Sequence, residues 1–111
     1  MGYIDKDGFK TWLKENYSTN DRVIRDTISR ADRVRRAFEE IDPTFSYENE
    51  IERDNGQSFW NLISRRGVTI KRKISLPVGS NQMDSISSAA KKYITYLREK
   101  NIVRHFELPP I

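Results

Sequence analysis

The 111-residue chain contains no cysteine and a single histidine, His105. The lack of cysteine excludes a disulfide framework, a thiolate nucleophile and a zinc or iron–sulfur site with cysteine ligands. One histidine argues against a multi-histidine metal site and against a Ser-His-Asp triad within one chain. We therefore expect no catalytic residue, no metal and no cofactor, and we predict that the protein is not an enzyme.

Long apolar runs are also missing from the sequence. No segment approaches the roughly 20 consecutive apolar residues that span a bilayer as a helix. The N-terminal region lacks the basic stretch followed by an apolar stretch that marks a signal peptide. These two absences predict a cytoplasmic protein without a membrane partner.

The charge is distributed unevenly along the chain. There are 20 Lys+Arg against 16 Asp+Glu, which gives a formal charge of +4. Residues 42–63 hold one Arg and five carboxylates, net −4, whereas residues 64–111 hold ten basic and three acidic residues, net +7. A basic half of this kind indicates a polyanionic partner.

Apolar periodicity predicts a single all-α domain over residues 1–111. The clearest helix covers residues 20–41, where apolar side chains recur at helical spacing and Pro43 follows. Further helices are expected at 5–16, within 48–54, at 58–66 and at 81–100. The twelve aromatic residues (five Tyr, five Phe, two Trp) are enough for one core.

One segment does not have a helical pattern. From Val68 to Leu76 apolar residues alternate with polar ones, which is typical of a strand. Pro77 and Gly79 then close the segment. The alternation predicts a short extended arm or hairpin at about residues 68–78.

Two stretches of the sequence resemble a known family. They are Phe9-Lys10-Thr11-Trp12-Leu13, followed by a polar cap at 17–20 and a long helix ending in Ala37-Phe38, and Ile86 to Leu97 near the end. Both are similar to the SAM-like core-binding domain of phage integrases, the tyrosine recombinases. The resemblance covers about residues 9–41 and 81–103.

The resemblance implies a SAM-like bundle of four to five helices that clamps DNA. The catalytic half of that family needs well over a hundred further residues, and the sequence ends at Ile111. The resemblance therefore implies a stand-alone DNA-clamping module, or one adapted to another role, without strand cleavage.

Three groups of basic residues are candidates for contact with DNA phosphates. One lies on the long helix (Arg33, Arg36), one follows it (Arg65, Arg66, Lys71, Arg72, Lys73), and one is Lys92 on the last helix. The middle group is the most informative, because no acid occurs between Ile63 and Asp84. Five like charges without a local counterion repel one another unless a polyanion binds and neutralises them. We predict non-enzymatic, weakly specific binding to duplex DNA.

An ordinary solvated surface remains an alternative for these cations. On the long helix, acids and arginines stand four residues apart, as in Asp32 and Arg36, which is the spacing of helix ion pairs. Lys-rich helix faces such as Lys91-Lys92 are often plain surface.

A different function class is suggested by four carboxylates close together in the sequence: Glu48, Glu50, Glu52 and Asp54. Their spacing fits no calcium loop. As an acidic face they would contact a protein partner, such as a nucleic-acid enzyme that a phage or mobile-element protein inhibits or regulates. An exposed acidic face without a partner is the simpler interpretation.

Overall fold

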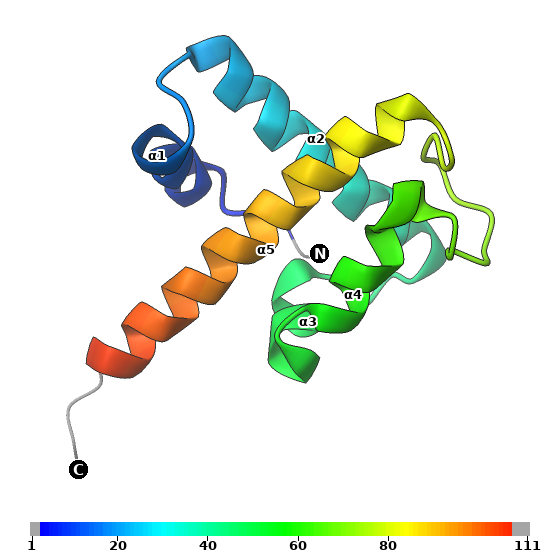
Figure 1. Cartoon of the computed structure of the whole chain (residues 1–111). Coiled ribbons are helices and arrows are strands. Elements are labelled where there is room, and N and C mark those ends of the chain that lie inside the picture. The colour runs from blue at the N-terminus through cyan, green and yellow to red at the C-terminus, as the bar shows by residue number, and fades with distance from the viewer. Residues whose placement is uncertain (1–2, 108–111) are drawn as a thin grey trace.

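One long helix runs across the whole molecule, and the shorter helices pack along its sides (Figure 1). The computed structural model describes the backbone of residues 3–107 and the side chains of residues 3–101. These residues contain five α-helices, one short 3₁₀ turn and no strand. The elements are α1 (Lys6–Asn16), α2 (Asp21–Ile41), α3 (Tyr47–Asp54), α4 (Gln57–Ile63), η1 (Arg65–Gly67) and α5 (Asn81–Glu107).

Side-chain caps determine where the first three helices begin. Asp5 accepts a hydrogen bond from the Gly8 N–H, Asn20 accepts from Arg22 and Val23, and Ser46 accepts from Asn49. Each cap satisfies a backbone donor that has no acceptor inside its helix. The predicted boundaries of α1 and α2 are confirmed to within one residue.

The last two predicted helices differ from the structure at their C-terminal ends. The helix expected over 58–66 ends earlier, at Ile63, because the chain then enters a left-handed turn. The helix expected to end at Lys100 continues to Glu107. The acidic segment at 48–54 does form a helix of its own, α3.

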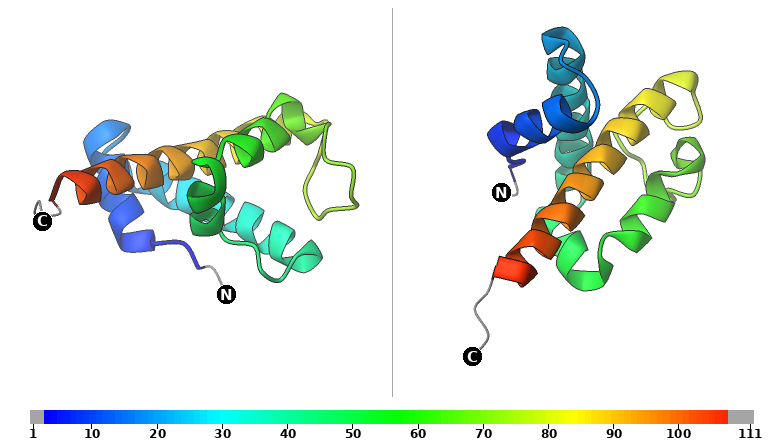
Figure 2. Two further views of the ribbon diagram at one scale, coloured as in Figure 1. Left: turned by 90° about the horizontal axis from the view of Figure 1, so that it is seen from below. Right: turned by 60° about the vertical axis from the view of Figure 1, so that its left-hand side comes forward.

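The sequence predicted a short extended arm or a hairpin at about residues 68–78, and the hairpin is wrong because the segment contains no strand. The segment between η1 and α5 is an irregular loop of turns without ladder hydrogen bonds, and Figure 2 shows it open at the end of the molecule where α5 begins. Its apolar residues do not share one face, since Leu76 is buried whereas Val68 is 59% exposed. Alternation alone does not make a strand without a partner edge to pair with.

Aromatic rings occupy the centre of the core. Tyr93 of α5 lies edge-on to Phe9 of α1 at 4.9 Å and to Tyr47 of α3 at 4.8 Å between ring centroids. Phe59 of α4 contacts Phe38 of α2 at 5.0 Å. Because α5 presents its rings to both sides, the predicted single core forms around it.

A buried arginine is accommodated within the apolar side of α2. Arg35 is only 6% exposed and pairs with Asp32 at 2.7 Å and with Glu39. The hydrogen bond that Arg35 Nε donates to Asp32 holds the pKa of Arg35 above its usual value. These two ion pairs remove Arg35 from any surface that binds anions.

Candidate nucleic-acid interface

A shallow groove runs along the outer face of α5. Its volume is about 340 Å³, and α4 with η1 forms one wall while Tyr17, from the α1–α2 connection, forms the other. Four cations line it: Arg65, Arg66, Lys91 and Lys92. We call this the cationic groove.

The last turn of α4 and the 3₁₀ turn place two arginines in the groove. Arg65 and Arg66 have positive φ values of 52° and 58°, and Gly67 follows with 72°. Two successive non-glycine residues in the left-handed region are unfavourable and occur mainly where a site needs them. This left-handed turn ends α4 and directs the chain away from α5 just after both arginines have been positioned there.

Hydrogen bonds fix this turn against α5 and the following loop. The Ser87 hydroxyl donates to the Ile63 carbonyl at 2.8 Å, and the Gly79 N–H donates to the Arg66 carbonyl at 2.8 Å. Arg66 also forms a two-pronged ion pair with Asp84, with nitrogen–oxygen distances of 3.2 Å. Arg66 thus keeps a partner in the groove, whereas Arg65 is exposed and takes part in no ion pair among the described residues.

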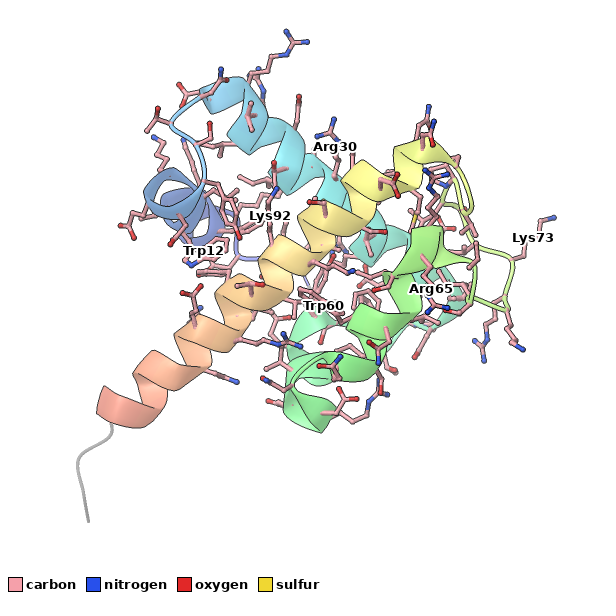
Figure 3. All side chains as sticks on the ribbon, viewed as in Figure 1. Trp12, Arg30, Trp60, Arg65, Lys73 and Lys92 are labelled. Atoms are coloured by element: carbon pink, nitrogen blue, oxygen red, sulfur yellow. The ribbon has the colours of Figure 1, made fainter. Side chains whose placement is uncertain are left out.

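Two aromatic rings hold the cations of α5 in place. Lys91 Nζ lies 4.9 Å and Arg98 Cζ 5.1 Å from the centre of the Trp60 ring, so both cations lie against the same indole. Lys92 Nζ lies 5.0 Å from the Tyr17 ring on the other side of α5. Figure 3 shows Trp60 and Lys92 on opposite sides of the α5 ribbon. Cation–π contacts of this kind restrict the lysines without neutralising them.

Few acids oppose these cations. Asp84 is engaged by Arg66, and Glu99, further along α5, accepts a hydrogen bond from Trp12 Nε1 at 2.7 Å. The Arg98 Nε donates to the Asn55 carbonyl at 2.8 Å, so this arginine also stabilises the turn between α3 and α4. The groove therefore retains an excess of positive charge along one helix face.

The eight basic residues predicted from the sequence do not form one surface. Arg65, Arg66 and Lys92 line the cationic groove, whereas Lys71 and Arg72 line a separate cleft beside the end of α2. Lys73 is exposed near the outer edge of the loop, well away from Lys92 in Figure 3.

The two predicted cations of α2 lie outside both hollows. Arg33 and Arg36 are exposed, and Arg36 pairs with Asp32 at 3.5 Å, as the helix spacing predicted. Lys91, which lines the groove, was not among the eight cations predicted from the sequence. Trp60 is only partly buried, and the spacing of Lys91 and Arg98, two helical turns apart, was the one signal that both contact the same neighbour.

The four carboxylates of the predicted acidic face are divided by α3. Glu48 and Glu52 face the later turns of α5, where they line a small hollow with Lys100. On the other side, Glu50 pairs with Arg53 at 2.6 Å, and Asp54 accepts from the Ser58 N–H at 3.0 Å. Glu48 also accepts a hydrogen bond from the Tyr93 hydroxyl at 3.4 Å, so three of the four have structural partners within the chain.

Among the residues that the structure describes, no three His, Asp or Glu side chains gather as a metal site, and no helix has the length and apolarity to cross a membrane. Comparison with protein-family models, with curated proteins and with solved structures gives no match for this chain. A functional assignment therefore depends on the geometry and chemistry of the chain itself.

Proposed function

We propose that the protein is a non-enzymatic DNA-binding module that holds duplex phosphates in the cationic groove. The observation that carries this proposal is the convergence of Arg65 and Arg66, from the left-handed turn, with Lys91 and Lys92, from α5, on one exposed surface. Their separation in sequence means that the fold, not a local charge run, assembles the surface. The SAM-like core-binding character of the bundle belongs to the same proposal.

The chemistry of the groove favours backbone contact over base reading. Its polar lining consists mainly of Arg, Lys, Ser and Thr side chains, including Ser88, whose hydroxyl lies 3.5 Å from Lys92 Nζ, and the lining carboxylate, Asp84, is paired with Arg66. Such groups bind phosphate oxygens, and guanidinium groups do so in pairs of parallel hydrogen bonds. Among the residues that the structure describes, no Asn or Gln lines the groove to make the paired contacts that read adenine. Binding should accordingly vary little with DNA sequence.

Fluorescence anisotropy of a labelled 20-base-pair duplex across a salt series tests the proposal. If the four groove cations make the contacts, the log–log slope of affinity against salt should be about −4, whereas contacts from all eight predicted residues would give about −7. Arg33, Arg36, Lys71, Arg72 and Lys73 are thus expected to act only as weak flanking contacts. Failure to bind at low salt, or an affinity that does not respond to salt, would refute DNA binding.

A matched pair of double variants localises the site. Arg65→Gln with Lys92→Gln should lower the affinity on the order of tenfold or more and reduce the salt slope by about 2. Lys6→Gln with Lys10→Gln removes the same charge from exposed positions of α1 that lie beside Asp7 and Asp21. An equal loss in both double variants would mean that overall charge, and not the groove, governs binding.

A further inference from the structure

A second hollow lies on a different part of the surface. It has a volume of about 550 Å³ and lies between the end of α2, helices α3 and α4, and residues 69–72 of the loop. Within the described part of the chain it shares no lining residue with the cationic groove. We call it the aromatic cleft, because Phe38, Phe45 and Phe59 form its floor.

The floor of the cleft belongs to the core. The Phe45 ring lies 5.4 Å from Phe38 and 5.2 Å from Phe59 between centroids, and all three side chains are at least nine-tenths buried. At the α2–α3 connection, where the lining includes Asp42 and Thr44, the Asp42 carboxylate accepts hydrogen bonds from the Thr44 N–H and hydroxyl. The floor is therefore rigid and apolar, as in a preformed ligand site.

The walls retain apolar surface that the chain does not cover. Ile41, Leu62 and Ile70 come from α2, α4 and the loop, and each is only partly buried against the core. A ligand that enters the cleft would remove this surface from water, and burial of apolar area is the main source of affinity in such sites. The volume matches a small molecule, since sites for these usually measure roughly 300–1,000 Å³.

The charged side chains at the rim of the cleft include one more cation than carboxylates. Glu50 pairs with Arg53 at 2.6 Å, and Arg72 faces Asp42 closely enough to lower the pKa of that carboxyl, although hydrogen bonds from Thr44 lower it more. Lys71 is exposed, and no ion pair among the described residues includes it. The rim therefore offers one ammonium group to an incoming anion.

From these observations we infer that the aromatic cleft binds a small amphipathic anion, a compound with an aromatic or aliphatic body and one negatively charged group. The body packs on Phe45 and Phe59 between Leu62 and Ile70, and the charged group lies at Lys71. This inference does not depend on the proposed DNA binding, because the two sites have separate linings.

The probe for this site is 8-anilinonaphthalene-1-sulfonate, and its control is N-phenyl-1-naphthylamine, the same ring system without the sulfonate. Titration with NMR detection should show saturable binding of one sulfonate per chain, with shifts at Leu62, Ile70 and Lys71. An unchanged near-ultraviolet circular dichroism spectrum would show that the protein stays folded, so that the binding does not come from unfolded or loosened protein. Shifts confined to Lys91 and Lys92, or the absence of saturation, would overturn the inference.

Two variants separate the charge from the apolar body. Lys71→Gln should weaken sulfonate binding about tenfold and leave the neutral control within twofold, because only the anion contacts the ammonium group. Thr69→Trp, at an exposed position of the lining, should block both compounds by filling the cleft. Lys73→Gln removes the same charge from the same loop outside the lining and should change neither affinity. If Lys71→Gln and Lys73→Gln weaken the sulfonate equally, the rim charge is not the recognition element.

DNA affinity distinguishes this inference from the proposed function. Lys71→Gln should leave the groove contacts intact and alter duplex affinity by less than threefold, whereas Arg65→Gln with Lys92→Gln should leave sulfonate binding unchanged. Loss of DNA binding together with sulfonate binding in Lys71→Gln would show that the two surfaces form one site and would overturn the assignment of a separate ligand.

Discussion

The cationic groove and the aromatic cleft differ in the side chains that line them. The groove consists of charged side chains on exposed helix faces, with Trp60 and Tyr17 as platforms beneath the lysines. The cleft has a floor of core phenylalanines, and its charges are confined to the rim. A single basic stretch of sequence supplies both sites, because after the left-handed turn the chain carries Lys71 and Arg72 to the cleft while Arg65 and Arg66 stay in the groove.

The largest expected effect comes from the floor of the cleft. Phe59→Ala removes a ring that contacts Phe38, Phe45 and Tyr47, so the free energy of unfolding should fall by about 3–5 kcal/mol. Lys92→Gln, in the groove, should change it by no more than about 0.5 kcal/mol. Urea denaturation followed by circular dichroism measures both variants.

This pair of variants tests whether the cleft is an extension of the core. A loss below about 1 kcal/mol for Phe59→Ala would mean that the floor relaxes around the missing ring, and the contrast with the groove would then disappear.

A smaller effect of opposite sign is expected at the left-handed turn. Arg65→Gly relieves the cost of a positive φ of 52°, so the free energy of unfolding should rise by about 0.5–1 kcal/mol while DNA affinity falls. Arg65→Gln should lower DNA affinity equally and leave stability unchanged. Urea denaturation and anisotropy on both variants measure the two quantities.

The result at Arg65 shows whether the left-handed backbone conformation lowers the stability of the fold while it places the Arg65 side chain in the groove. A destabilised Arg65→Gly would mean that the side chain contributes more to the fold than its backbone conformation costs, and the groove would then be structural at this residue.

The smallest effect is a dependence of the cleft on pH. Burial raises the pKa of Glu50, and the charge of Arg53 offsets this only in part, while Asp54 and Asp42 add to it. Because the raised pKa favours the neutral carboxyl, acidification removes this negative charge from the lining at a higher pH than for an ordinary glutamate. Sulfonate binding should therefore strengthen about two- to threefold as the solution is made acidic.

Glu50→Gln provides the control for this dependence, since it should bind the sulfonate with the strengthened affinity at every pH. The lining of the cationic groove does not include Glu50, so this variant should leave duplex affinity unchanged. A pH response that persists in Glu50→Gln would assign it to another group.

Much of the helical architecture could be predicted from local signals. Asn20 before α2 and Pro43 after it marked that helix, and the capping serine at Ser46 explains the separate α3. The loop could not be predicted, because the burial of Leu76 and the exposure of Val68 depend on neighbours distant in sequence. The continuation of α5 past Lys100 to Glu107 was not predicted either.

The groove was predicted only in part. Arg65, Arg66 and Lys92 were identified from charge, but nothing in the sequence indicated that two arginines would adopt left-handed backbone angles and leave Lys71 and Arg72 on another surface. The contacts of Lys91 with Trp60 and of Lys92 with Tyr17 join residues far apart in sequence, so a count of charges along the chain does not reveal them.

The central position of α5 has a consequence for how the protein folds. This helix contacts α1, α2, α3, α4 and η1, and the Tyr96 hydroxyl bonds Asp5 at 2.6 Å across most of the chain. All of its partners are synthesised before it. During synthesis on the ribosome, the apolar sides of α1 to α4 therefore stay exposed until residues of α5 such as Tyr93 and Leu97 emerge. Folding should be a late event dominated by long-range contacts, and slower than is usual for helical proteins of this size.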